Sequence, residues 1–358
     1  MQLTEVSARQ WEYLARKDLS PKEAAAFLLS GLELRTFPDN LKRLYQGEDL
    51  TPRLVRKLTE YAQRDPKPAK EDSVRKKVQN WMKNKNLPSD REELFRIAFA
   101  LELDEEQTEL LLRRTAEQGI HYRSARELVY AFSLRNHQSY ETARACAETF
   151  EKLRTKGRGE HAPMTGFLKM EFQNLPPGED IMGFLMQHSE SLGEYHNTAY
   201  QYYMKMLNLL TEGDEQEEVY SMEYVADHYL RMKMPLDKRT SAYSDMQKMI
   251  KKYWPGVRSI KGMKNRTEDV SRKALLLMYL ITGGVWDAEY DELDEEYLTP
   301  REILEEHCSR LNQILEECGM NSMDPRNPFD YLVLYCLKPR EDDDMSRRME
   351  QIVEELFL

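Results

Sequence analysis

Helix-start signatures recur along this chain of 358 residues, and they constrain its fold more than any other feature. A Ser or Thr N-cap accepts hydrogen bonds from the free amides of the first helical turn, and a Glu three residues later reaches back to the cap. A related pattern has Asn as the cap and Pro at the first helical position. The segments that fit are Ser20-Pro-Lys-Glu23, Ser89-Asp-Arg-Glu92, Ser124-Ala-Arg-Glu127, Thr299-Pro-Arg-Glu302 and Asn327-Pro-Phe-Asp330.

Apolar residues between these starts follow helical spacing. Leu94, Ile97, Ala98 and Leu101, for example, form one stripe along a helix. No Asn-Gly or Asp-Gly hairpin turn and no convincing alternation of apolar and polar residues points to a β-strand. The sequence therefore predicts an all-α fold.

A Gly- and Pro-rich stretch interrupts the helical pattern. Residues 155–180 contain four Gly and three Pro, which break helices and mark linkers. We therefore place the main domain boundary near residue 160. The expected domains are an N-terminal helical domain at 1–120, connecting helices at 121–160 and a larger C-terminal helical bundle at 161–358.

The composition is typical of a globular protein, with 41% hydrophobic and 32% charged residues. The longest apolar run, at 274–281, is far shorter than the roughly 20 residues of a membrane-spanning helix, and the N-terminus has no apolar signal core. The four cysteines include no CxxC pair, which favours reduced thiols over a disulfide framework. We therefore expect a cytoplasmic protein without a membrane segment.

The net charge of -11 argues against a protein that coats nucleic acid indiscriminately. Basic residues nevertheless gather in two islands. Residues 64–86 hold eight Lys or Arg and three acidic residues, and residues 231–273 hold thirteen and four. Surface charges can also cluster by chance. The second island offers a second candidate basic face at Lys251, Lys252, Arg258 and Lys261.

The first island contains an amphipathic segment at residues 73–86. Val74, Val78 and Trp81 fall at i, i+4 and i+7 and would form an apolar underside. A helix-turn-helix needs such an underside together with a basic outer face that enters the major groove. Arg suits guanine edges, Asn and Gln suit adenine edges, and Lys suits phosphates. The candidate DNA contacts are Arg75, Lys76, Gln79, Asn80, Lys83 and Lys85. The alternative is an ordinary helical hairpin whose lysines face water.

The stretch VQNWMKNKNLPSDREELFRIAFALEL resembles the third to fifth helices of phage-repressor-like (Cro/C1, XRE-type) helix-turn-helix proteins. This resemblance, within residues 73–103, implies a DNA-binding domain. Two features depart from the family. The preceding helix is followed by the long, Pro-broken RDPKPAKEDS instead of a tight turn, and Asn84 stands where the family has Gly. Degenerate domains of this type also serve as protein-interaction modules. The matching residues are Val78, Trp81, Lys85, Pro88, Ser89, Leu94, Ala98, Ala100, Leu101 and Leu103.

The whole chain is also similar to helical proteins of Gram-positive gut bacteria and their mobile elements. The strings that carry this similarity are HNTAY at 196–200, YSMEYV at 220–225 and DPRNPFDYLVLY at 324–335. It implies a bacterial cytoplasmic protein and carries no biochemical assignment.

No enzyme motif is present: GxxxxGK[ST], GxGxxG and HExxH are all missing from the sequence. His188, Glu190, Glu194 and His196 are close in sequence and of metal-ligating type. The two histidines are eight residues apart, however, and not at the i, i+4 spacing of a helical zinc pair. We therefore predict no catalytic residue, metal or cofactor.

The function that the sequence favours is a DNA-binding transcriptional regulator with a C-terminal sensing or oligomerisation domain. Its partners would be double-stranded DNA and a protein partner or a second copy of the chain. The alternative is a non-enzymatic adaptor or regulatory subunit that binds a protein partner through its helical domains.

Overall fold

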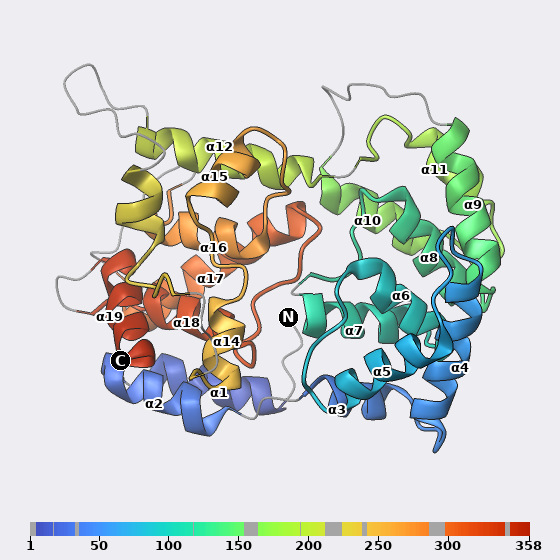
Figure 1. Cartoon of the computed structure of the whole chain (residues 1–358). Helices are drawn as coiled ribbons and strands as arrows, with labels where there is room; N and C mark the ends of the chain where they lie inside the picture. The colour runs from blue at the N-terminus through green and yellow to red at the C-terminus, as the bar shows by residue number, and fades with distance from the viewer. Residues whose placement is uncertain are drawn as a thin grey trace. The chain divides into compact units, whose positions relative to one another are not determined.

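Helices follow one another along the described part of the chain, and no β-strand occurs in it (Figure 1). The predicted all-α fold is confirmed over these residues. None of their helices is long and apolar enough to cross a membrane. The structure, a computed structural model, describes residues 5–16, 18–32, 36–116, 118–153, 164–193, 195–211, 224–237, 242–285, 298–340 and 344–358.

The chain divides into two compact units. The middle unit comprises residues 35–194 together with 319–321. The terminal unit comprises residues 1–34, 195–318 and 322–358.

The middle unit contains both halves of the predicted helix-turn-helix. Its helices are α3 (Phe37–Leu44), α4 (Leu50–Gln63), α5 (Glu71–Met82), α6 (Arg91–Ala100), α7 (Glu105–Ala116), α8 (Ala125–Arg135), α9 (Tyr140–Leu153), α10 (Thr165–Asn174) and α11 (Ile181–Gln187).

The terminal unit joins the first helices of the chain to the last ones. Its elements are α1 (Glu5–Arg16), α2 (Pro21–Gly31), α12 (Asn197–Thr211), the π-helical η1 (Val225–Leu230), α14 (Asp245–Lys251), α15 (Val257–Lys264), α16 (Arg272–Ile281), α17 (Pro300–Glu317), α18 (Pro328–Leu337) and α19 (Met345–Phe357).

The first helices belong with the last because contacts distant in sequence hold them there. The hydroxyl of Tyr335 donates to the carbonyl oxygen of Leu19 at 3.2 Å, and Lys338 pairs with Asp18 at 3.0 Å. This arrangement differs from the expected N-terminal domain, and residues 155–163 at the expected boundary lie outside the described residues. The expected division was 1–120, 121–160 and 161–358.

Several predicted helix starts are present with their caps. Ser20 and Thr299 each form the full reciprocal pair with the Glu three residues later. The start expected at Ser89 is displaced, because α6 begins at Arg91 and Asp90 is its N-cap. The Asp90 carboxylate accepts from the amide of Glu93 at 2.8 Å, so Glu92 is not needed at the cap.

The apolar underside of α5 lies in the core of the middle unit, as the sequence predicts. Val74, Val78 and Trp81 are all buried, and Trp81 is only 1% exposed. The indole packs edge-to-face against Phe37 of α3, with ring centroids 6.4 Å apart. The helix therefore has one fixed side and one side available to a partner.

The end of α5 depends on the backbone conformation of Asn84. Asn84 has φ of +52°, in the left-handed region that favours Gly and that Asn tolerates better than most residues. The amide of Lys85 donates to the carbonyl oxygen of Asn80 at 2.9 Å, which closes the helix end. Asn84 thus adopts a backbone conformation that favours Gly and ends the helix there.

Trp81→Ala is expected to lower the free energy of unfolding of the protein by about 3–5 kcal/mol, because it removes a large buried side chain and leaves a cavity. Chemical denaturation followed by circular dichroism measures this. Trp81→Phe keeps most of the packing and should cost clearly less. A change below about 0.5 kcal/mol for Trp81→Ala, the range of surface substitutions, would contradict the burial of this side chain.

Candidate nucleic-acid interface

The outer face of α5 carries most of the predicted DNA contacts. Arg75, Lys76 and Gln79 are exposed on the helix, and Lys83 and Lys85 are exposed just after it. Asn80 is half-buried, so it is less accessible than the other candidates. Five of the six candidate side chains can therefore reach a ligand without a change in the fold.

The cations of α5 differ in how they are engaged. Arg75 pairs with Glu71 one turn earlier on the same helix. Lys77, which the sequence does not single out, pairs with Glu93 of α6 and lies over the Trp81 ring, with Nζ 5.7 Å from the ring centroid. Lys77 therefore holds α5 against its scaffold.

Lys76, Lys83 and Lys85 contrast with these two cations. None of the three forms an ion pair with another residue that the structure describes. Exposed cations that form no ion pair with a described residue can pair with a ligand without first breaking an internal contact. These three lysines are consequently the strongest candidates for contact with phosphate.

A hollow of about 350 Å³ adjoins the end of α5. Met82 lines it together with Lys42, Tyr45 and Leu50 from the end of α3, the loop after it and the start of α4. The hollow brings Lys42, which the sequence does not suggest, close to the exposed end of α5. A polyanion that contacts Lys83 could therefore also meet Lys42.

The long connection between α4 and α5 is tied down at its first two residues. Arg64 pairs with Glu141 at the start of α9. The carboxylate of Asp65 accepts two hydrogen bonds from the guanidinium of Arg96, at 2.7 and 2.9 Å, and one from Arg144 at 2.9 Å. The chain thus leaves α4 along α9 before it enters α5, which explains why it cannot be a tight turn.

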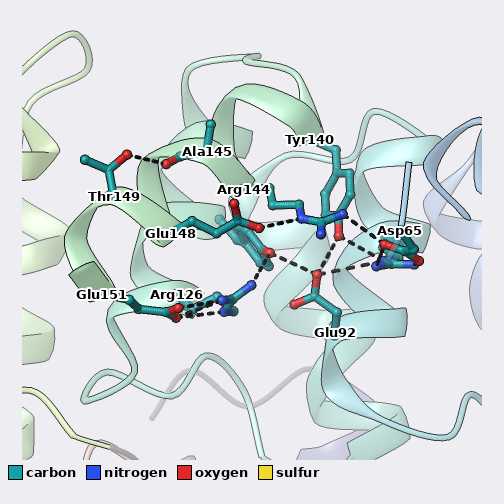
Figure 2. A network of polar contacts seen from close by, with 11 residues as sticks. Asp65, Glu92, Arg126, Tyr140, Arg144, Ala145, Glu148, Thr149 and Glu151 are labelled. Atoms are coloured by element: carbon teal, nitrogen blue, oxygen red, sulfur yellow. Dashed lines mark hydrogen bonds and ion pairs between the residues drawn. The ribbon is translucent and has the colours of Figure 1, made fainter. Parts of the chain in front are cut away.

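Asp65 belongs to a larger polar network, which Figure 2 shows around Glu92 and Tyr140. The hydroxyl of Tyr140 donates to Glu92 at 2.6 Å and accepts from Nε of Arg96 at 2.9 Å. Tyr130 also donates to Glu92, at 2.9 Å. Burial and the neighbouring Glu92 raise the pKa of Tyr140 to about 12, so its hydroxyl keeps its proton and acts as a donor. The network fixes the geometry of α6, α8 and α9 around the connection to α5.

The charge state of Asp65 predicts a dependence of stability on pH. Burial raises the pKa of this carboxyl, but hydrogen bonds and charges from Arg96 and Arg144 outweigh it and hold the pKa below its usual value. A lowered pKa in the folded state contributes stability that is complete above the ordinary value of about 3.9 and is lost as the pH falls below it.

Asp65→Asn should therefore lower the free energy of unfolding by about 1.5–3 kcal/mol near neutral pH, the range for hydrogen bonds to charged groups. The difference from the wild type should shrink as the pH falls from about 5 to 2. Urea denaturation at several pH values measures it. Glu48→Gln is the control, because this exposed loop carboxylate forms no ion pair with a described residue. A difference that stays constant with pH would contradict the role of the Asp65 charge.

The residues of the second candidate basic face lie in the terminal unit and are not equivalent. Lys251 pairs with Asp237 at 2.9 Å, and its side chain is only 15% exposed. Lys252 is half-buried, and its Nζ lies 4.6 Å from the centroid of the Tyr253 ring. Arg258 and Lys261 are exposed on α15. Lys251 therefore has a structural role, and the exposed charge lies further along the chain.

The histidines of the metal-like segment have separate partners. His188 follows the end of α11, pairs with Glu171 at 3.3 Å and packs on Phe184 with ring centroids 4.6 Å apart. His196 precedes α12, and its Nδ1 lies 2.5 Å from a carboxylate oxygen of Asp269. Glu190 is exposed, and Glu194 lies outside the described residues, as do residues 220–223 of the YSMEYV segment.

Comparisons with known proteins add no assignment. No protein-family model matches the chain, and no curated protein or solved structure matches it. The proposals below therefore rest on the residues and contacts described above.

Proposed function

We propose that the protein binds double-stranded DNA through the outer face of α5 and acts as a transcriptional regulator in a bacterial cytoplasm. The observation that carries this proposal is the division of α5 into two sides. Val74, Val78 and Trp81 anchor one side in the core. The other side carries Lys76 with no ion pair to a described residue, and Lys83 and Lys85 continue this unpaired charge past the helix end. The terminal unit would then serve for sensing or for association with a second copy.

Base recognition in this proposal falls to Arg75 and Gln79. Arg75 would exchange its ion pair with Glu71 for a guanine edge. An exposed pair on a helix is worth only about 0–1 kcal/mol, whereas a bidentate contact with a base discriminates by about 1–3 kcal/mol. The exchange is therefore favourable, although Glu71 and Asp72 repel phosphates near the start of α5.

A non-enzymatic adaptor is the second candidate function, and one observation favours it. Met164, Phe167 and Met170 are 51%, 43% and 51% exposed, respectively, and they follow one another at intervals of three residues at and along α10. Exposed large apolar side chains in a row suit contact with another protein. In this alternative, α5 is part of a helical scaffold and has no affinity for duplex DNA.

Two classes of substitution on α5 should separate base contacts from phosphate contacts. Arg75→Ala or Gln79→Ala should each cost about 1–3 kcal/mol of binding and relax sequence preference. Lys83→Ala or Lys85→Ala should weaken all duplexes alike and lower the slope of log K against log salt by about one. Binding to promoter DNA at about 50 and 200 mM salt measures both. If no binding is detectable at the lower salt, the proposed DNA binding is excluded and the adaptor remains as the candidate function.

Glu71→Gln provides a test in the opposite direction. It frees Arg75 and removes a negative charge from the face that would meet DNA, so duplex affinity should rise. Glu106→Gln removes an equal charge from an exposed position at the start of α7 and is the matched control. Equal gains for both variants would show that net charge, and not the α5 face, governs binding.

A further inference from the structure

The terminal unit presents a second basic surface, formed by the end of α14, the turn after it and α15. Residues 246–267 contain no Asp or Glu, although the chain as a whole is acidic. Arg258 and Lys264 are exposed and form no ion pair with any residue in the described ranges. Arg258 and Lys264 therefore contribute positive charge that no ion pair within the described residues neutralises.

The cations of α15 lie opposite its buried side. Ile260 and Met263 are buried, whereas Arg258, Lys261 and Lys264 are exposed at intervals of three residues. The helix dipole favours Lys261 and Lys264 near the C-terminus but disfavours Arg258, the second residue of the helix. Like charges one turn apart also repel each other. An anion bound along this face would offset both the unfavourable position of Arg258 in the helix dipole and the repulsion between the cations.

The turn between α14 and α15 is held rigidly. Nζ of the buried Lys273 donates to the carbonyl oxygen of Ile250 at 2.9 Å and also to that of Lys252. The indole Nε1 of Trp254 donates to the carbonyl oxygen of Leu230 at 2.8 Å. These bonds lie on both sides of Tyr253 and fix its backbone.

Tyr253 is the unusual residue of this surface. Its φ is +59°, in the left-handed region, and it is 58% exposed. Lys252 covers part of the ring, with its Nζ 4.6 Å from the centroid. A residue that is held in a sparsely populated conformation and also exposes an aromatic ring is a candidate ligand contact.

We infer that this surface binds single-stranded nucleic acid without sequence preference. The three cations of α15 would contact successive phosphates, and Tyr253 would stack on an unpaired base. Such proteins combine a cationic track with aromatic stacking platforms, and single strands suit this combination because their bases are free to stack. Contacts with phosphates and stacking on an aromatic ring are both insensitive to base identity, so the expected binding has no sequence preference. It does not depend on α5, which lies in the other unit.

The test uses the full chain and a fluorescent oligothymidylate of about 20 nucleotides, which spans a typical site. Wild type should bind at about 50 mM salt and more weakly at 200 mM. Tyr253→Ala should lose about tenfold in affinity, and Tyr253→Phe should retain it, because stacking needs the ring alone. The triple variant Arg258→Gln, Lys261→Gln, Lys264→Gln should lower the salt slope by about two.

The matched control removes three positive charges elsewhere in the chain, by Arg9→Gln, Lys22→Gln and Lys152→Gln. These three positions are exposed and form no ion pair with a residue that the structure describes. Circular dichroism and the melting temperature verify that each variant is folded. Lys83→Ala and Lys85→Ala on α5 should lower oligothymidylate affinity much less than the triple variant does, which separates this inference from the proposed duplex binding. The inference is overturned if wild type does not bind at the lower salt. It is also overturned if the control loses as much affinity as the triple variant, or if Tyr253→Ala binds as well as Tyr253→Phe.

Discussion

The carboxylate of Asp65 accepts hydrogen bonds from Arg96 of α6 and Arg144 of α9, and the arrangement of the middle unit around α5 depends on this contact. Asp65 is the second residue of the connection from α4 to α5, so its contacts direct the chain as it leaves α4. Because the two arginines also bond Tyr140 and Glu148, the carboxylate is part of a network and not an isolated pair. A charge that is partly removed from water needs such partners, and the same partners fix the direction of the chain.

The two groups of cations on α5 follow from this scaffold. Lys77 faces α6 and bonds Glu93, so its charge is used within the fold. Lys76 points away from such partners, as do Lys83 and Lys85 beyond the helix end. These three lysines repel one another and form no ion pair with a described residue. Their presence is understandable if a polyanion supplies the opposite charge. Helix periodicity alone does not distinguish Lys76 from Lys77.

Much of the fold could be predicted from the sequence, because its signals are local. Each of these signals depends on residues within two helical turns. Examples are the caps at Ser20 and Thr299 and the apolar spacing of Val74, Val78 and Trp81. The candidate face of α5 could be predicted for the same reason, with Asn80 as the less accessible exception.

Contacts between distant segments could not be predicted. Asp65 and Arg144 are 79 residues apart, and nothing near either residue identifies the other. The association of the segment before α2 with α18, through Leu19 and Tyr335, likewise cannot be seen in a local pattern. The start of α6 was displaced by one residue because two neighbouring side chains, Ser89 and Asp90, can both act as caps. Where two neighbouring residues can each cap a helix, tertiary contacts decide which of them does so. Here those contacts are the hydrogen bonds that two tyrosines donate to Glu92.

The two basic surfaces differ in chemistry, and the difference bears on what each can recognise. The α5 face mixes cations with Gln79 and has acidic residues at Glu71 and Asp72, so an incorrectly placed phosphate there is repelled. Such a mixture of attraction and repulsion suits a ligand of defined geometry, as a duplex groove is. The surface around α15 has no acid within residues 246–267, and it adds the ring of Tyr253. The contacts proposed for that surface, phosphate binding and stacking, do not depend on base identity, so sequence preference in this protein would have to come from α5.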